Sequence, residues 1–171
     1  MGESFEFREA THFTAGAIGT PGNRVFYLQA GDGSHYVSVK VEKQQVVALA
    51  GFLRTVLDDL PTPDEPVDSF VALIEPALPE WVVGQIAVGV DEAASSVVIV
   101  VEELSFVDED EDDDDPLGLD DLNASLRVQI TPAQAEAFIA TTDILLAGGR
   151  PPCRLCGQPE DPGGHACPRL N

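Results

Sequence analysis

Residues 36–61, YVSVKVEKQQVVALAGFLRTVLDDLP, combine two apolar repeats that meet at Glu42. Before this junction, valines at positions 37, 39 and 41 alternate with other residues, which predicts a strand with one buried face. After it, large apolar residues recur every three or four positions, which predicts a helix with one apolar stripe. The stripe comprises Val46, Leu49, Leu53, Val56 and Leu60. Pro61 is expected to end the helix.

Two more strands are predicted upstream, at residues 13–18 and 24–29. Glycine-rich segments at 19–23 and 31–34 separate the three strands, as turns do. Strands joined by such short loops pair antiparallel, so we expect a three-stranded meander followed by a helix. The connector 64–80 is broken by prolines, and residues 69–75 could form one short helix within it.

The second half of the chain repeats this order. Strands are predicted at 81–90, 97–104 and 125–130, and Thr131, Pro132 and Gln134 form a typical helix start with a capping box. When the first half of the chain is aligned with the second at an offset of 89 positions, Val39 matches Val128 and several other apolar positions also match. We therefore predict an α+β fold: an antiparallel sheet from two βββα pseudo-repeats, with the helices on one face.

The acidic residues are concentrated in one segment. The chain has 171 residues and a formal net charge of −21, and positions 108–115 are all Asp or Glu. Such a run repels itself and buries nothing, so we expect an acidic disordered loop at about 106–121. It lacks the interleaved glycine of an EF-hand calcium loop. An acidic arm that docks on a basic partner is the alternative.

The last part of the chain contains all three cysteines. Cys153 and Cys156 form a Cys-X2-Cys pair, and His165 and Cys167 form a His-X-Cys pair eight residues later. Three thiolates and an imidazole are the donor set of a closed structural zinc site, in which no position is left for a catalytic water. We predict an α+β domain at 1–149 and a small C-terminal zinc knuckle at 150–171, which the metal helps to fold.

A redox Cys-X-X-Cys motif is the main alternative, but that motif normally lies between a strand and a helix. A disulfide framework is not favoured because three cysteines cannot all pair. Arginine side chains near the metal could donate hydrogen bonds to a carboxylate or phosphate. They are Arg150, Arg154 and Arg169.

No other residues form a recognisable catalytic or binding motif. His12 and His35 stand alone and are expected at the surface or in packing contacts. The glycine-containing segments lack the following helix of a phosphate loop, and no serine lies in a nucleophile elbow. We therefore predict no catalytic residue.

Several segments together resemble an uncharacterised family of actinobacterial proteins that is classed as a domain of unknown function. They are ESFEF (3–7), FYLQA (26–30), EKQQ (42–45) and the ending with Cys-X-X-Cys and Gly-His-X-Cys-Pro-Arg. The resemblance implies a protein without an assigned activity. It also implies gene neighbours that resemble a phosphoinositide kinase and a histidine phosphatase, so a kinase-like protein encoded nearby is a possible partner.

We expect a non-catalytic zinc-containing protein that binds or scaffolds a protein partner. A nucleic-acid-binding zinc knuckle is one alternative, which the net charge of −21 opposes. An enzyme acting on phosphorylated substrates is another. No apolar run is long enough to span a membrane and the start lacks a signal peptide, so we expect a cytoplasmic protein.

Overall fold

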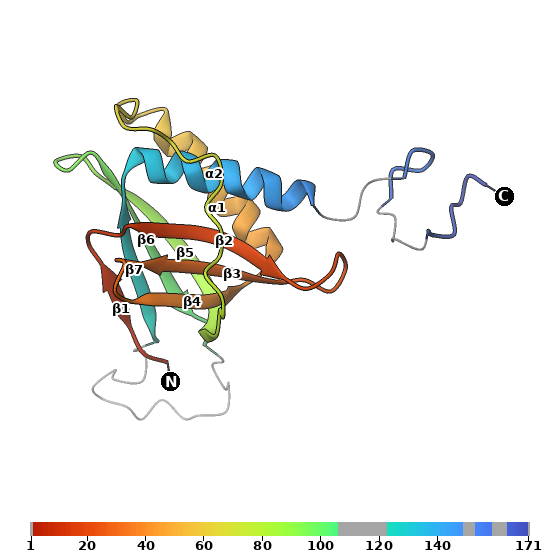
Figure 1. The fold of residues 1–171 in the computed structure, drawn as a ribbon, viewed down its shortest axis with the longest axis horizontal. Coiled ribbons are helices and arrows are strands. Elements are labelled where there is room, and N and C mark those ends of the chain that lie inside the picture. Colours follow the sequence, from red (N-terminus) through yellow and green to blue (C-terminus); the bar gives the residue numbers. More distant parts are fainter. Residues whose placement is uncertain (1, 106–122, 149–152, 159–163, 171) are drawn as a thin grey trace, which may run out of the picture.

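The computed structural model describes residues 2–105, 123–148, 153–158 and 164–170 (Figure 1). Within them, seven strands form one sheet in the order β1-β7-β6-β5-β4-β3-β2, and two helices accompany it. The strands are β1 (Phe5–Phe7), β2 (His12–Ile18), β3 (Val25–Gly31), β4 (Tyr36–Val41), β5 (Pro79–Asp91), β6 (Ser96–Glu103) and β7 (Ser125–Ile130). The helices are α1 (Lys43–Leu57) and α2 (Pro132–Ala147). The fold is therefore mixed α+β, as predicted.

The sheet contains two antiparallel meanders. In the first, β3 pairs with both β2 and β4, and Leu28 lies opposite Ala15 on one side and Val39 on the other. In the second, β6 pairs with both β5 and β7, and Ile99 lies opposite Val88 and Val128. The alternation of apolar residues in β4 and β7 thus marks the face that the structure buries.

The prediction of a wholly antiparallel sheet is wrong, because the sheet is mixed. β4 and β5 are parallel, with Lys40 opposite Val82, and β1 and β7 are parallel, with Phe5 opposite Leu126. Helix α1 connects β4 to β5 and returns the chain to its starting side, which is the connection that parallel neighbours require. The rule that strands joined by short loops pair antiparallel applies only within each meander.

Both helices start with the same arrangement. Gln45 and Gln134, which lie 89 positions apart, each close a capping box at the third residue of their helix. Each also donates a hydrogen bond across to a distant carbonyl, Gln45 to Gly84 and Gln134 to Ala10. The internal duplication itself stays a prediction.

The chain forces the sheet to curl. β1 and β2 lie at opposite edges of the sheet, yet only residues 8–11 join them. That link spans at most about 18 Å, whereas seven flat strands would be about 29 Å wide. Accordingly, the ring of His35, just before β4, lies 5.8 Å from that of Phe5 in β1. Figure 1 shows β2, β3 and β4 crossing in front of the other meander.

The inner side of the curled sheet and the two helices share one apolar core. Helix α1 contributes the stripe that its sequence predicts, with Val46, Leu49 and Leu53 buried. Helix α2 contributes Phe138, which is fully buried and stacks on Phe13 of β2 with 4.9 Å between ring centroids. Burial of apolar surface in this single core is the main source of stability.

Residues 61–78 cross the outer face of β2, β3 and β4 as an extended strap (yellow in Figure 1). The short helix considered for 69–75 is absent from this described segment. Side chains of the sheet bind the strap backbone instead: the Thr14 hydroxyl donates to the carbonyl of Val71, and the Gln29 amide bonds to both backbone groups of Ile74. Because these bonds replace helical ones, the strap stays extended.

Two predictions concern residues that the structure does not describe. The acidic loop expected at about 106–121 lies outside the described residues, as does the boundary near 149–150.

Among the described residues, neither helix is long and apolar enough to cross a membrane.

The Phe13 and Phe138 stack predicts a large difference between two chemically identical substitutions. Phe138→Ala should lower the free energy of unfolding by about 3–5 kcal/mol because it leaves a cavity in the core. Phe52→Ala removes a ring that is 58% exposed on α1, so it should change this energy by about 0.5 kcal/mol or less. Urea unfolding followed by circular dichroism measures both values, and equal losses would contradict the packing described.

Candidate metal centre

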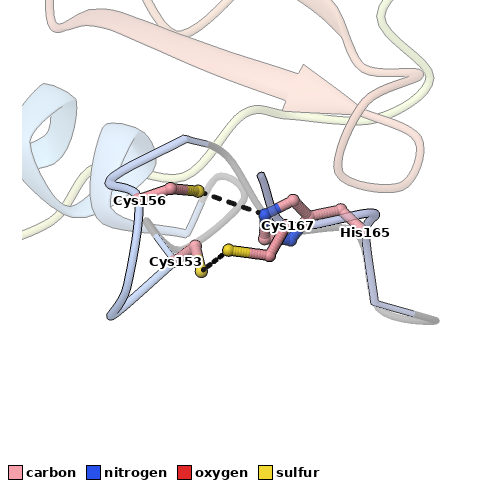
Figure 2. Close-up of side chains that lie close together, drawn as sticks. All are labelled: Cys153, Cys156, His165 and Cys167. Atoms are coloured by element: carbon pink, nitrogen blue, oxygen red, sulfur yellow. Dashed lines mark hydrogen bonds between the residues drawn. The ribbon is translucent and has the colours of Figure 1, made fainter. Parts of the chain in front are cut away.

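Cys153, Cys156, His165 and Cys167 come together in the structure (Figure 2). They belong to two described segments, 153–158 and 164–170, which follow α2 in the sequence. One ligand atom from each residue lies within 4.8 Å of the others, and Figure 2 shows the four side chains pointing toward one another. The four residues selected from their spacing could therefore hold one metal ion.

Two of the distances between the donors are close to those of a tetrahedral centre. The Sγ atoms of Cys153 and Cys167 are 4.0 Å apart, and Sγ of Cys156 lies 3.3 Å from Nε2 of His165. A tetrahedron with ligand bonds of about 2.1–2.3 Å has edges of about 3.6–3.8 Å. The cysteines are free thiols, so no disulfide competes for the sulfur atoms.

A tight turn positions the first pair of ligands. The N–H of Cys153 donates to the carbonyl of Gln158 at 2.7 Å, and the N–H of Gly157 donates back to the carbonyl of Cys153 at 2.8 Å. Gly157 has a φ of +74°, a conformation that glycine adopts without a steric penalty. The turn therefore depends on the Cys-X-X-Cys-Gly order of residues.

The second pair is held by a similar change of direction. Gly164 precedes His165 and has a φ of +89°, and the N–H of Leu170 donates to the carbonyl of Cys167 at 3.1 Å. Both pairs thus lie beside a glycine with positive φ, in segments without regular secondary structure. Local turn geometry, rather than a helix or strand, aims these donors.

Backbone donors prepare Cys153 to act as a thiolate. The N–H groups of Cys156 and Leu155 point at its sulfur and lower the pKa of the Cys153 thiol. For Cys156, the N–H of Gln158 acts in the same direction, but burial and the neighbouring thiols outweigh it and raise the pKa. A divalent cation would relieve this crowding, because thiolates that repel one another share its charge.

The cluster excludes most solvent. Cys153 and Cys167 are buried, and Cys156 and His165 are half-buried. The Nδ1 atom of His165 is also buried, and within the described residues it has no hydrogen-bond partner. Nitrogen and sulfur donors of this kind favour first-row transition metals and zinc over magnesium or calcium.

The arginines named from the sequence do not all fall in the described region. Arg154 and Arg169 are exposed in the same two segments as the ligands, whereas Arg150 lies outside the described residues. The other histidines belong to the sheet domain: His12 bonds to Gln29, and His35 packs on the rings of Phe5 and Phe7.

Sequence reasoning missed one contributor to the centre. The backbone N–H of Leu155 lies 3.5 Å from Sγ of Cys153 and stabilises charge on that sulfur. The signal was present in the order Cys-X-X-Cys-Gly, because a glycine at that position lets the chain fold back over the first cysteine.

A family model described as "Protein of unknown function (DUF3090)" matches residues 5–167. The chain belongs to the DUF3090 family. The match confirms the resemblance to a domain of unknown function, and it includes all four donors of the cluster. No curated protein and no solved structure matches this DUF3090 chain.

Cobalt(II) provides a direct test of the donor geometry in this DUF3090 protein. Titration of the metal-free protein should give the intense visible d–d bands of tetrahedral cobalt and thiolate charge-transfer bands, saturating at one ion per chain. His165→Ala should weaken these bands, whereas His35→Ala, which removes a histidine from the sheet domain, should not. Weak octahedral bands would contradict the tetrahedral arrangement.

Proposed function

We propose that the cluster holds one structural zinc ion. Three sulfur atoms and one imidazole nitrogen are a donor set that zinc prefers. All four donor atoms lie within 4.8 Å of one another, and two of their separations, 4.0 Å and 3.3 Å, are close to the edges of a zinc tetrahedron. Four protein donors complete that geometry and leave no position for a reacting water. This argues for a structural role rather than a catalytic one.

The proposed role of zinc is to fold the tail. The described tail segments contain no helix or strand, and their buried residues are Cys153 and Cys167 themselves. A segment with so little apolar surface cannot offset its conformational entropy by burial. Metal binding would supply the missing free energy, as in other small zinc modules.

We further propose that the protein is a non-catalytic binding or scaffold protein, and that the tail presents its recognition surface. The observation that supports this is a pair of exposed Arg-Leu sequences beside the ligands. Arg154 and Leu155 follow Cys153, and Arg169 and Leu170 follow Cys167 after one residue. The two leucines are 49% and 73% exposed. Exposed leucine beside arginine suits contact with a protein partner.

The partner that fits is a protein with apolar and acidic groups. The kinase-like protein that the resemblance implies is a first partner to test. A net charge of −21 opposes nucleic acid as the ligand. The three ligand thiols also need a reducing compartment, which supports a cytoplasmic location.

Zinc content tests the first proposal. Protein purified without added metal should contain about one zinc per chain by elemental analysis. Cys153→Ser should lose most of this zinc because it removes one of the four donors, while its sheet domain should unfold at an unchanged urea concentration. Wild-type protein with no bound metal, and no zinc uptake on dialysis, would contradict the proposal.

Copurification of a protein partner tests the second proposal, that the tail is the binding surface. The double variant Leu155→Ala/Leu170→Ala should keep its zinc but bind a copurifying partner at least about tenfold more weakly, since each leucine would lose buried area. Leu78→Ala is a matched control, because Leu78 is 74% exposed on the sheet domain. Equal capture by wild type and the double variant would show that the tail is not the binding surface.

A further inference from the structure

A cavity of about 290 Å³ lies in the sheet domain, apart from the ligands of the metal centre. The start of β2, the strap and the first turns of α2 form its walls. Its lining includes apolar residues such as Val71 and Ala137, and its polar groups include His12, Glu65 and Asp68. This volume is near the lower end of ligand pockets, so it suits a small molecule.

A hydrogen-bond network fixes the proton of the His12 ring. The Gln29 amide is oriented by Ile74, whose N–H donates to Oε1 at 2.8 Å and whose carbonyl accepts from Nε2 at 2.9 Å. Oε1 of Gln29 also lies 2.9 Å from Nε2 of His12. Because this oxygen can only accept, Nε2 of His12 must carry the proton.

The other ring nitrogen of His12 is consequently an acceptor. Nδ1 has a lone pair and, within the described residues, no hydrogen-bond partner. Burial lowers the pKa of His12, although the Gln29 bond offsets this in part, and this favours the neutral ring. The ring of Tyr36 packs against it in a T-shaped arrangement, with 5.5 Å between ring centroids, and further limits its rotation.

The charged residues of the cavity wall are acidic. Glu65 and Asp68 are exposed residues of the strap, and no lysine or arginine lines the cavity. The polar groups at the start of α2 are already occupied: the hydroxyl of Thr131 accepts from the N–H of Gln134, and the Gln134 amide bonds to Thr131 and Ala10. Besides the hydroxyl of Thr11, His12 and the two carboxylates remain to receive hydrogen bonds from a ligand.

We propose that this cavity binds a small organic ammonium ion, with His12 Nδ1 and the carboxylates of Glu65 and Asp68 as its acceptors. An ammonium group has three donors and a positive charge, which matches three acceptors of which two are anionic. The apolar lining residues, among them Val71 and Ala137, would contact a short carbon chain. The site uses none of the metal ligands, so it is independent of the proposed zinc function.

The probe is 1,4-diaminobutane, added to the full-length protein at physiological salt, with 1,4-butanediol as a neutral molecule of similar size. Calorimetry should show saturable binding of the diamine only. The chain has three histidines, so its imidazole signals can be followed individually by NMR. The His12 signals should shift on binding, and those of His35 and His165 should not.

Two neutralising variants separate this site from general attraction to an acidic protein. Asp68→Asn should weaken binding about fivefold, which corresponds to the loss of one exposed ion pair. Asp64→Asn also removes one negative charge, but from an exposed neighbour that does not line the cavity. The affinity of this variant for the diamine should therefore stay within about twofold of wild type. The proposal would be overturned if the two variants lost affinity for the diamine equally. It would also be overturned if the His12 NMR signals did not shift on binding, or if the diol bound as tightly as the diamine.

Discussion

The short link between β1 and β2 constrains the whole sheet domain. It joins the two edges of the sheet, so the sheet cannot lie flat, and its inner face becomes a concave surface. Only two helices are then needed to cover that surface. The α1 stripe and Phe138 of α2 complete one core with residues from both meanders. The strap covers the outer face of the first meander, where Gln29 would otherwise be exposed.

Much of this fold could be predicted from local patterns. β4, Tyr36–Val41, has the boundaries expected from its alternating valines, and the start of α2 follows its capping residues. The parallel pairings were not predictable in this way, because they join segments that are distant in the sequence. β1 was also missed, since three residues are too few to show an alternating pattern. The strap depends on contacts of Gln29 and Thr14 that no local pattern records.

The same distinction applies to the sites. The four donors of the metal centre lie within fifteen residues, so their spacing indicates their convergence. His12 was treated as an isolated residue, because its partner Gln29 and the carboxylates near it come from other parts of the chain. A site assembled by tertiary folding leaves little trace in the sequence, whereas a site built from turns is almost entirely local.

The pairing of β1 with β7 affects how the domain is made in the cell. Ser4 and Ser125, which bond beside this pair, are 121 positions apart. Because synthesis proceeds from the N-terminus, β1 emerges early but waits for most of the chain before its partner strand is available. Long-range pairing of this kind also slows folding. The pairing of β1 with β7 therefore cannot form before β7 is synthesised. A nascent chain stopped before residue 125 would leave the edge of β6 unpaired, and unpaired edges promote association with other chains.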